Sequence, residues 1–160
     1  MNNARYFAPC PRGLEPLLAE DVAAAGARDI RQVPGGVHFG GHQETCYRVN
    51  LESRIATRVL WRQTHGTYRG EAEVYRMAMA VDWPRLFSVD QTLRVYVTSI
   101  RSPLKSLNFA ALRIKDAVCD ALRDATGARP SVDTRHPDLP LLLYLSAERA
   151  HLYADTSGEA

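Results

Sequence analysis

In the first 64 residues, the spacing of apolar positions switches between the period of a strand and that of a helix. Steps of three and four from Leu14 to Ala25 predict a helix that ends at Gly26, because glycine readily adopts the conformation that follows a helix. The expected elements are a strand at 4–10, a helix at 14–25, strands at 28–33 and 37–39, a helix at 42–51 and a strand at 55–64. This order is that of the ferredoxin-like split βαβ arrangement.

Glycine and proline clusters separate these elements. Pro34-Gly35-Gly36 is expected to bend a tight hairpin between two strands. Gly40-Gly41 is interpreted as a second turn, because neither pair has the spacing of a glycine-rich phosphate loop. Arg54, just before the last strand, would align with Arg58 and Arg62 on a helix, but the β-branched residues at 55–64 favour a strand whose solvent-facing side carries Arg58 and Arg62.

The second half of the chain begins after a turn-rich join at residues 65–70, and we place a domain boundary near this join. The expected elements are a helix at 71–81, a helical turn at 82–87, a strand at 92–100, a long helix ending at Gly127, a loop at 128–140, a buried strand at 141–145 and a strand at 150–155. In the strand at 92–100, Leu93, Val95 and Val97 are expected to face the core. The last two strands are expected to form an antiparallel hairpin against the long helix.

The long helix has clear end signals. Ser106 or Asn108 is expected to cap its start, and Gly127 with Pro130 just beyond marks its end. Asp116 and Asp120 fall on the side opposite its apolar stripe. The expected stripe comprises Leu107, Ala111, Ile114, Val118, Ala121 and Leu122.

Composition places the chain among ordinary globular proteins. Apolar residues make up 46% and charged residues 24% of 160 positions. No apolar run reaches the length of a membrane span, and the N-terminus lacks the layout of a signal peptide, so we expect a cytoplasmic protein with no membrane partner. Cys10, Cys46 and Cys119 lie far apart without a CxxC pair, which indicates reduced, buried cysteines rather than a zinc or redox motif.

The distribution of charge along the chain indicates a kind of binding partner. The net charge is only +2, yet the segment from residue 94 to residue 115 contains basic residues and no acidic one. A one-sided run of this kind suggests a polyanion. Of the 20 basic side chains 18 are arginine, which suits bidentate phosphate contacts but is also what a GC-rich genome encodes. The run comprises Arg94, Arg101, Lys105, Arg113 and Lys115.

Arg101 and Lys105 lie in a basic turn between the strand at 92–100 and the long helix. They are expected to converge with the first turns of that helix, whose free amide groups add to the positive field. Such a site would hold phosphates by position and charge without reading bases. A solvated charged face is the alternative interpretation. The candidate RNA-binding residues are Arg94, Arg101, Lys105, Arg113, Lys115, Arg58 and Arg62.

The sequence offers no candidate catalytic residues and no candidate metal site. His38 and His42 are four residues apart but straddle a strand end and a glycine pair, where one helix could not present both. Asp116 and Asp120 lie one helical turn apart, but no apolar setting is expected to raise the pKa of either carboxyl group. Cys119 lacks a histidine partner.

Pro11-Arg12-Gly13, before the first helix, leaves two interpretations open. Free amide groups at a helix start can bind an anion. A plain strand-to-helix turn accounts for the same residues.

Four stretches together resemble a known family. They are RGLEPLLAEDV at 12–22, GGVHF at 35–39, NFAALRIKDAVCDAL at 108–122, and RPSVD and HPDLP followed by LYL and a strand ending DTSG at 129–158. Their order and spacing resemble the N-terminal region of the bacterial 23S ribosomal RNA guanine-N2 methyltransferases of the large RlmL type. The resemblance covers essentially all 160 residues.

The resemblance implies an α+β chain with a ferredoxin-like N-terminal subdomain at 1–65, a THUMP-like α/β domain at 66–157 that binds RNA, and the start of a linker at 158–160. It also implies 23S rRNA as partner. The basic turn and Lys115 would carry the RNA-binding role, because the helix matching NFAALRIKDAV belongs to the THUMP domain in that family. Its catalytic domain, which uses S-adenosylmethionine and an Asn-Pro-Pro or Asp-Pro-Pro motif, would follow residue 158, so no cofactor is expected in this chain and the chain alone is not expected to methylate.

Two other interpretations compete with RNA binding. A ferredoxin-like pair could act as a small-molecule regulatory module, which predicts a closed apolar pocket with a few polar groups. Alternatively, the basic face could dock the C-terminal catalytic domain of the same chain.

Overall fold

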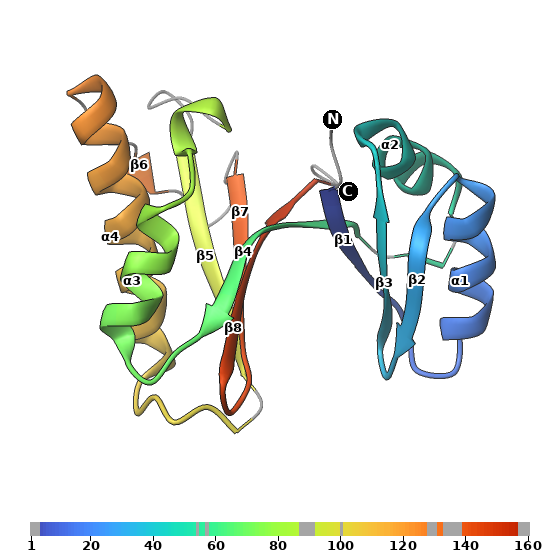
Figure 1. Cartoon of the computed structure of the whole chain (residues 1–160), viewed down its shortest axis with the longest axis horizontal. Helices are drawn as coiled ribbons and strands as arrows, with labels where there is room; N and C mark the ends of the chain where they lie inside the picture. The colour runs from blue at the N-terminus through green and yellow to red at the C-terminus, as the bar shows by residue number, and fades with distance from the viewer. Residues whose placement is uncertain are drawn as a thin grey trace. The chain divides into compact units, whose positions relative to one another are not determined.

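The computed structural model describes residues 4–53, 55–56, 58–86, 92–99, 101–127, 131–132 and 139–156. By their internal contacts, these residues divide into a first unit, Met1–Arg62 with Asp155–Ala160, and a second unit, Gln63–Ala154 (Figure 1). Several positions that carry sequence predictions lie outside the described residues. These are Arg54, Phe87, Ile100 and the ranges 128–130, 133–138 and 157–160.

The first unit is an antiparallel sheet with two helices. Its strands are hydrogen-bonded in the order β2-β3-β1-β4, with Tyr6 of β1 opposite both Phe39 of β3 and Trp61 of β4. Phe39, Leu18 and Val22 are buried in its core. This arrangement confirms the predicted ferredoxin-like order. Its elements are β1 Ala4–Pro9, α1 Glu15–Ala24, β2 Arg28–Val33, β3 Gly36–Gly41, α2 Gln43–Glu52 and the start of β4 Leu60–Thr67.

Gly40 and Gly41 belong to β3, so their interpretation as a turn was wrong. A Cβ atom on Gly41 would lie 2.9 Å from Cβ of Thr45, which is buried in α2. Real Cβ atoms essentially never approach so closely, so glycine here allows the first turn of α2 to pack against the strand.

The strand expected at residues 55–64 begins at Leu60 and continues to Thr67. Ser53 explains the late start, because its hydroxyl oxygen accepts hydrogen bonds from the backbone N–H groups of Ile55 and Ala56 at 3.2 and 3.1 Å. These bonds hold residues 55–56 in a local turn that competes with strand pairing. The expected join at His65-Gly66-Thr67 is therefore strand.

The second unit is a mixed sheet covered on one face by α3 and α4 (Figure 1). Its strand order is β4-β8-β7-β5-β6, in which β5 pairs in parallel with β6 and β7, and β7 pairs antiparallel with β8. The predicted hairpin of the last two strands is confirmed. The elements are α3 Glu71–Met79, η1 Trp83–Arg85, β5 Thr92–Ser99, α4 Leu107–Thr126, β6 Ser131–Val132, β7 Leu139–Leu145 and β8 Arg149–Asp155.

Strand β7 is buried on one face and not on both, which corrects the expectation of a fully buried strand. Leu141, Leu143 and Leu145 are fully buried, whereas Leu142 and Tyr144 are half-buried. The helices cover only one face of this sheet, so alternate side chains face away from the core. The short strand β6 lies within the segment expected to be loop, and β7 already begins at Leu139.

Helix α4 has the predicted ends. The hydroxyl oxygen of Ser106 accepts a hydrogen bond from the N–H of Phe109 at 3.1 Å, and Gly127 adopts a φ of 83°. Its buried stripe differs from the prediction, because Leu107 is 37% exposed while Ala110 and Ala117 are fully buried. The helix packs against α3 as well as the sheet, and this second contact widens the buried side.

The three cysteines are buried and free, as expected. Among the described helices, none is long and apolar enough to cross a membrane. Each unit has its own cluster of buried apolar side chains.

Candidate nucleic-acid interface

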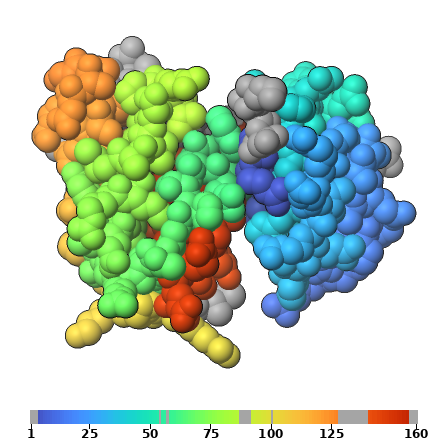
Figure 2. All heavy atoms as spheres, viewed as in Figure 1, coloured from blue at the N-terminus to red at the C-terminus, as the bar shows by residue number. Residues whose placement is uncertain are grey.

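The basic turn joins β5 to α4 and exposes both of its predicted cations. Arg101 and Lys105 are exposed, and the turn ends at Ser106, which caps α4. Arg101 adopts a φ of 61°, a left-handed conformation that is uncommon for a residue with a side chain. Figure 2 shows yellow side chains from this part of the chain projecting at one end of the second unit. The turn therefore presents two long, positively charged side chains to solvent beside the N-terminus of α4.

A buried tyrosine fixes the position of this turn. The Tyr68 hydroxyl donates a hydrogen bond to the carbonyl oxygen of Ser146 at 2.6 Å and lies 2.7 Å from Oγ of Ser102. Ser102 also accepts a bond from the N–H of Leu104 at 3.1 Å, and the N–H of Tyr68 donates to the carbonyl oxygen of Glu148 at 3.1 Å. Tyr68 thus ties the basic turn to the turn between β7 and β8.

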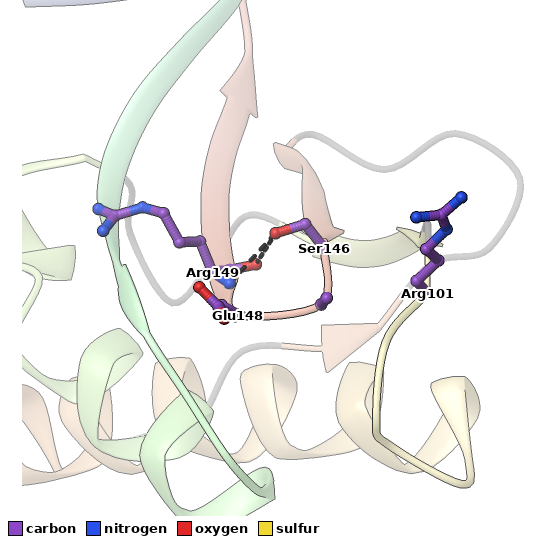
Figure 3. A pocket seen from close by; sticks show the side chains of 5 residues that line it. Arg101, Ser146, Glu148 and Arg149 are labelled. Atoms are coloured by element: carbon purple, nitrogen blue, oxygen red, sulfur yellow. Dashed lines mark hydrogen bonds between the residues drawn. The ribbon is translucent and has the colours of Figure 1, made fainter.

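A surface hollow of about 420 Å³ lies beside Arg101 and is lined by Arg101 and by Ser146, Ala147, Glu148 and Arg149 of the β7–β8 turn (Figure 3). Figure 3 shows Arg101 and Arg149 on opposite sides of it, with Glu148 nearer Arg149. Ser146 shapes the turn, because its hydroxyl oxygen accepts from the N–H of Arg149 at 3.1 Å. The Glu148 carboxylate lowers the positive potential, so the hollow is not a purely basic anion site.

Arg94 lies on β5 at a position that faces away from the helices. Leu93 and Val95 pack in the core, and strand side chains alternate between faces, so Arg94 and Tyr96 share the open face. The Cζ atom of Arg94 lies 4.4 Å from the centroid of the Tyr96 ring. This is a cation–π contact.

Arg113 and Lys115 lie on α4, in the layer on the other side of the sheet. Arg113 forms an ion pair with Asp116 at 3.2 Å and places its Cζ atom 4.4 Å from the centroid of the Tyr75 ring on α3. Lys115 is half-buried at the border of the buried stripe. The segment 94–115, which has no acidic residue, is therefore followed directly by Asp116. Arg113 already interacts with Asp116 and Tyr75.

Arg58 and Arg62 belong to the first unit. Arg58 forms an ion pair with Asp155 at 3.6 Å, and the Asp155 side chain is only 13% exposed. Arg62 is half-buried in β4. The structure brings Arg101 and Lys105 together in one turn, but it places Arg94 and Arg113 on opposite sides of the sheet.

Asp116 and Asp120, which were weighed as an acid–base pair, form ion pairs with arginines, and Asp120 also accepts a hydrogen bond from a tyrosine. Asp116 pairs with Arg113, and Asp120 pairs with Arg123 at 3.1 Å. Tyr75 also donates to Asp120 at 2.7 Å, and this hydrogen bond raises the pKa of Tyr75. These contacts fit a helix surface that joins α3 to α4.

Glu15 binds an amide group just before α1, where the sequence offered an anion site, and a second amide group in the β2–β3 turn. Its carboxylate oxygens accept hydrogen bonds from the N–H of Gly13 at 2.8 Å and the N–H of Gly35 at 2.9 Å. The two bonds lower the pKa of Glu15. The plain-turn interpretation therefore fits better, with Glu15 as the internal anion.

His38 and His42, whose spacing resembles that of metal ligands, have different local environments in the structure. The His38 ring lies 4.6 Å from the Phe7 ring centroid, and His42 is the N-cap residue of α2. Within the described ranges, no three His, Cys, Asp or Glu side chains are grouped to hold a metal ion.

Sequence reasoning missed Tyr68 and Arg149. Tyr68 lies in the turn-rich join, where no periodic pattern identifies it as buried. Arg149 could have been found, because it begins the alternation in which Arg149, His151 and Tyr153 face one way and Ala150 and Leu152 the other.

Two family models match the chain. Residues 5–60 match the RlmL ferredoxin-like domain, and residues 68–155 match the THUMP domain. Two relatives named ribosomal RNA large subunit methyltransferase K/L are similar over 98% of this chain. The one from Syntrophotalea carbinolica is 38% identical and the one from Cellvibrio japonicus is 35% identical.

The chain covers only 22% and 21% of these two relatives, so it spans about a fifth of their length. Among solved structures, a candidate methyltransferase complexed with SAH is 21% identical and has a TM-score of 0.83, covering 98% of this chain and 42% of that chain. That likeness shows a shared fold. The two domain matches, in the order that the fold displays, show that this chain belongs to the THUMP domain family and carries an RlmL ferredoxin-like domain in front of its THUMP domain.

Proposed function

We propose that this chain is the RNA-binding front part of an S-adenosylmethionine-dependent methyltransferase that modifies guanine N2 in 23S rRNA. The single observation that carries the proposal is the match of residues 68–155 to the THUMP domain within a chain 38% identical to a named large-subunit rRNA methyltransferase. The working division is 1–65 for the ferredoxin-like subdomain, 66–157 for the RNA-binding domain and 158–160 for the start of a linker. We expect the protein to be located in the cytoplasm, where rRNA is found.

The basic turn is proposed as the main RNA grip. Arg101 and Lys105 are exposed, and Tyr68 fixes the turn that carries them, so their charges are presented without a large ordering cost on binding. Lys115 can extend from the helix border, because its stem packs while its ammonium group reaches solvent. Four further arginines are proposed to contribute less to RNA binding, and two of these, Arg113 and Arg58, already pair with carboxylates. The four are Arg94, Arg113, Arg58 and Arg62.

Methyl transfer is proposed to take place in the part of the longer relatives that this chain does not span. S-adenosylmethionine would supply the methyl group there, and a solved structure of similar fold is complexed with SAH. The glycine pair of this chain does not fit a nucleotide cradle, because Gly40 and Gly41 lie within β3 with neighbouring side chains where a ligand would need space. The residues of this chain would bind and orient RNA for that catalytic domain.

The test is a salt titration of RNA binding. Each phosphate contact adds about 0.7 to 0.9 to the slope of log affinity against log salt, so replacing Arg101, Lys105 and Lys115 with Glu should flatten the slope by at least about 2. Binding of a duplex RNA should fall steeply between roughly 50 and 200 mM salt for the parent chain. Fluorescence anisotropy measures both quantities.

A matched control reverses three exposed arginines elsewhere, namely Arg12, Arg48 and Arg85, and changes net charge by the same amount. This variant should keep most of the slope. Equal losses in the two triple variants would mean that net charge alone drives binding, and salt-independent binding by the parent would contradict a phosphate grip.

A further inference from the structure

The open face of the second unit's sheet carries a set of aromatic side chains. On β5, β7 and β8 the alternate positions that face the helices are apolar and buried or partly buried. The positions that face away include the rings of Tyr96, Tyr144, His151 and Tyr153. Strand register places Leu142 opposite both Tyr96 and Tyr153, and Tyr144 opposite both Thr98 and His151. Residues from three strands thus form two neighbouring rows on one surface.

Three of the rings are nearly parallel. His65 of β4 and His151 of β8 have centroids 5.7 Å apart and planes 7° apart, and His151 and Tyr153 have centroids 6.2 Å apart and planes 14° apart. Tyr144 lies 6.3 Å from His151 at a tilt of 57°. The offset spacing is that of stacked aromatic neighbours.

The rings differ in how much they face solvent. Tyr96 is 38% exposed and His65 is exposed, whereas Tyr144 and His151 are half-buried. Tyr153 is buried, so it supports the row from within rather than offering a contact surface. Accessible aromatic area is therefore available at Tyr96 and His65, and in part at Tyr144 and His151.

The charges on this face are complementary to a nucleic acid. Among the described side chains at the outward positions of β5, β7 and β8 within the second unit, the charged ones are Arg94 and Arg149. Arg94 lies over the Tyr96 ring at 4.4 Å, and Nη2 of Arg149 lies 2.7 Å from Nδ1 of His65. Because arginine only donates, His65 accepts at Nδ1. The basic turn with Arg101 follows at the end of β5.

We propose that this open sheet face is a stacking platform for unpaired nucleotides of RNA, with Tyr96 and Tyr144 contacting bases and Arg94 and Arg149 contacting phosphates. Bases stack on aromatic rings and on guanidinium planes irrespective of sequence, and flanking cations hold the strand. The platform rests on the proposed RNA-binding function and adds its substrate class, which is single-stranded RNA beside a structured segment. Phosphate contact at the basic turn does not require it.

The test compares a single-stranded RNA of about ten nucleotides with the same RNA carrying abasic sites, which keeps phosphates and removes bases. The parent chain should bind the intact RNA more tightly than the abasic RNA. Each replacement Tyr96→Ala or Tyr144→Ala should weaken binding of the intact RNA by about 5- to 150-fold, and leave the abasic RNA and a duplex unaffected. Tyr96→Phe and Tyr144→Phe, which keep the rings, should bind like the parent.

Tyr47→Ala, at a tyrosine 64% exposed on α2, is the matched control and should change nothing. Equal binding of intact and abasic RNA by the parent would overturn the platform without requiring any variant to fold. So would alanine variants that bind intact RNA like the parent. If the parent bound duplex RNA with a steep salt dependence but failed these comparisons, only the platform would fall; if it bound no RNA, the proposed function would fall with it.

Discussion

At the scale of single residues, the hydrogen bonds of a buried tyrosine, rather than surface charges, set the geometry of the basic turn. Tyr68 is 4% exposed, and its hydroxyl connects Ser102 of that turn to Ser146 of the β7–β8 turn. Arginine and lysine composition pointed to this region, but composition carries no information about which residue holds it in place. The buried tyrosine could be found only from the folded chain, because its partners lie far along the sequence.

Replacing Tyr68 with Phe should lower the free energy of unfolding of the second unit by about 1 kcal/mol, because the partly buried carbonyl oxygen of Ser146 loses the hydrogen bond that the tyrosine donates. Urea unfolding followed by circular dichroism measures the change. Tyr47→Phe, at an exposed position, serves as control. A Tyr68→Phe variant as stable as this control would mean that the hydroxyl does not fix the turn.

At the scale of elements, α3 and α4 are joined by polar groups along their shared edge. The Tyr75 hydroxyl of α3 donates to Asp120 of α4 at 2.7 Å, and Arg113 of α4 covers the same ring. The hydrogen bond to Asp120 is the largest cause of the raised pKa of Tyr75, followed by partial desolvation. The apolar periodicity predicted both helices, but it could not predict which polar side chains meet across them.

The raised pKa of Tyr75 gives the α3–α4 contact a pH dependence. The contribution of the neutral hydroxyl to stability is fully present below the ordinary tyrosine pKa of 10.0 and is lost as pH rises through the higher pKa of the folded state. We expect the parent chain to lose more stability than a Tyr75→Phe variant as the pH is raised above 10.0. Thermal unfolding of both chains across this range measures the difference, and parallel pH profiles would contradict the contact.

Element boundaries show where local sequence is sufficient. The ends of α4 were predictable, because Ser106 and Gly127 act on their own helix. The start of β4 and the continuation of β3 were not, because Ser53 captures the amide groups of Ile55 and Ala56, and Gly41 makes room for Thr45. The Ser53 hydroxyl is itself held by the hydrogen bond that it donates to Asp21 of α1 at 2.9 Å, and Gly41 and Thr45 make a packing contact, so both outcomes depend on contacts that form only in the folded chain.

At the scale of the whole molecule, the first unit is discontinuous in sequence and the second is continuous. The first unit ends at Arg62 and resumes at Asp155, and Thr156 contacts it again. Its hydroxyl donates to the carbonyl oxygen of Val59 at 2.7 Å and accepts from Nδ2 of Asn50 at 3.2 Å. The resemblance of the sequence to a two-domain family predicted the order of the parts, whereas the sequence interpretation assigned residues up to 157 to the second part.

Replacing Thr156 with Val should destabilise the first unit by about 1 to 2 kcal/mol, because it removes hydrogen bonds to Val59 and Asn50. Hydrogen exchange should speed up in β1 and α2. Thr67→Val, at an exposed position in β4, is the matched control. Unchanged exchange in α2 of the Thr156→Val variant would mean that these bonds do not close the first unit.

The return of Thr156 to Val59 makes the whole second unit a loop of the first. Holding the ends of a flexible loop on the order of 100 residues together costs roughly 4 to 5 kcal/mol of chain entropy. While the second unit is folded, its rigid sheet carries β4 and β8 and removes most of that freedom in advance. If the second unit unfolds, the full entropy cost of closing the loop falls on the first unit, so unfolding of the second unit destabilises the first. Unfolding of the first unit imposes no loop-closure cost on the second, because the second unit is continuous in sequence.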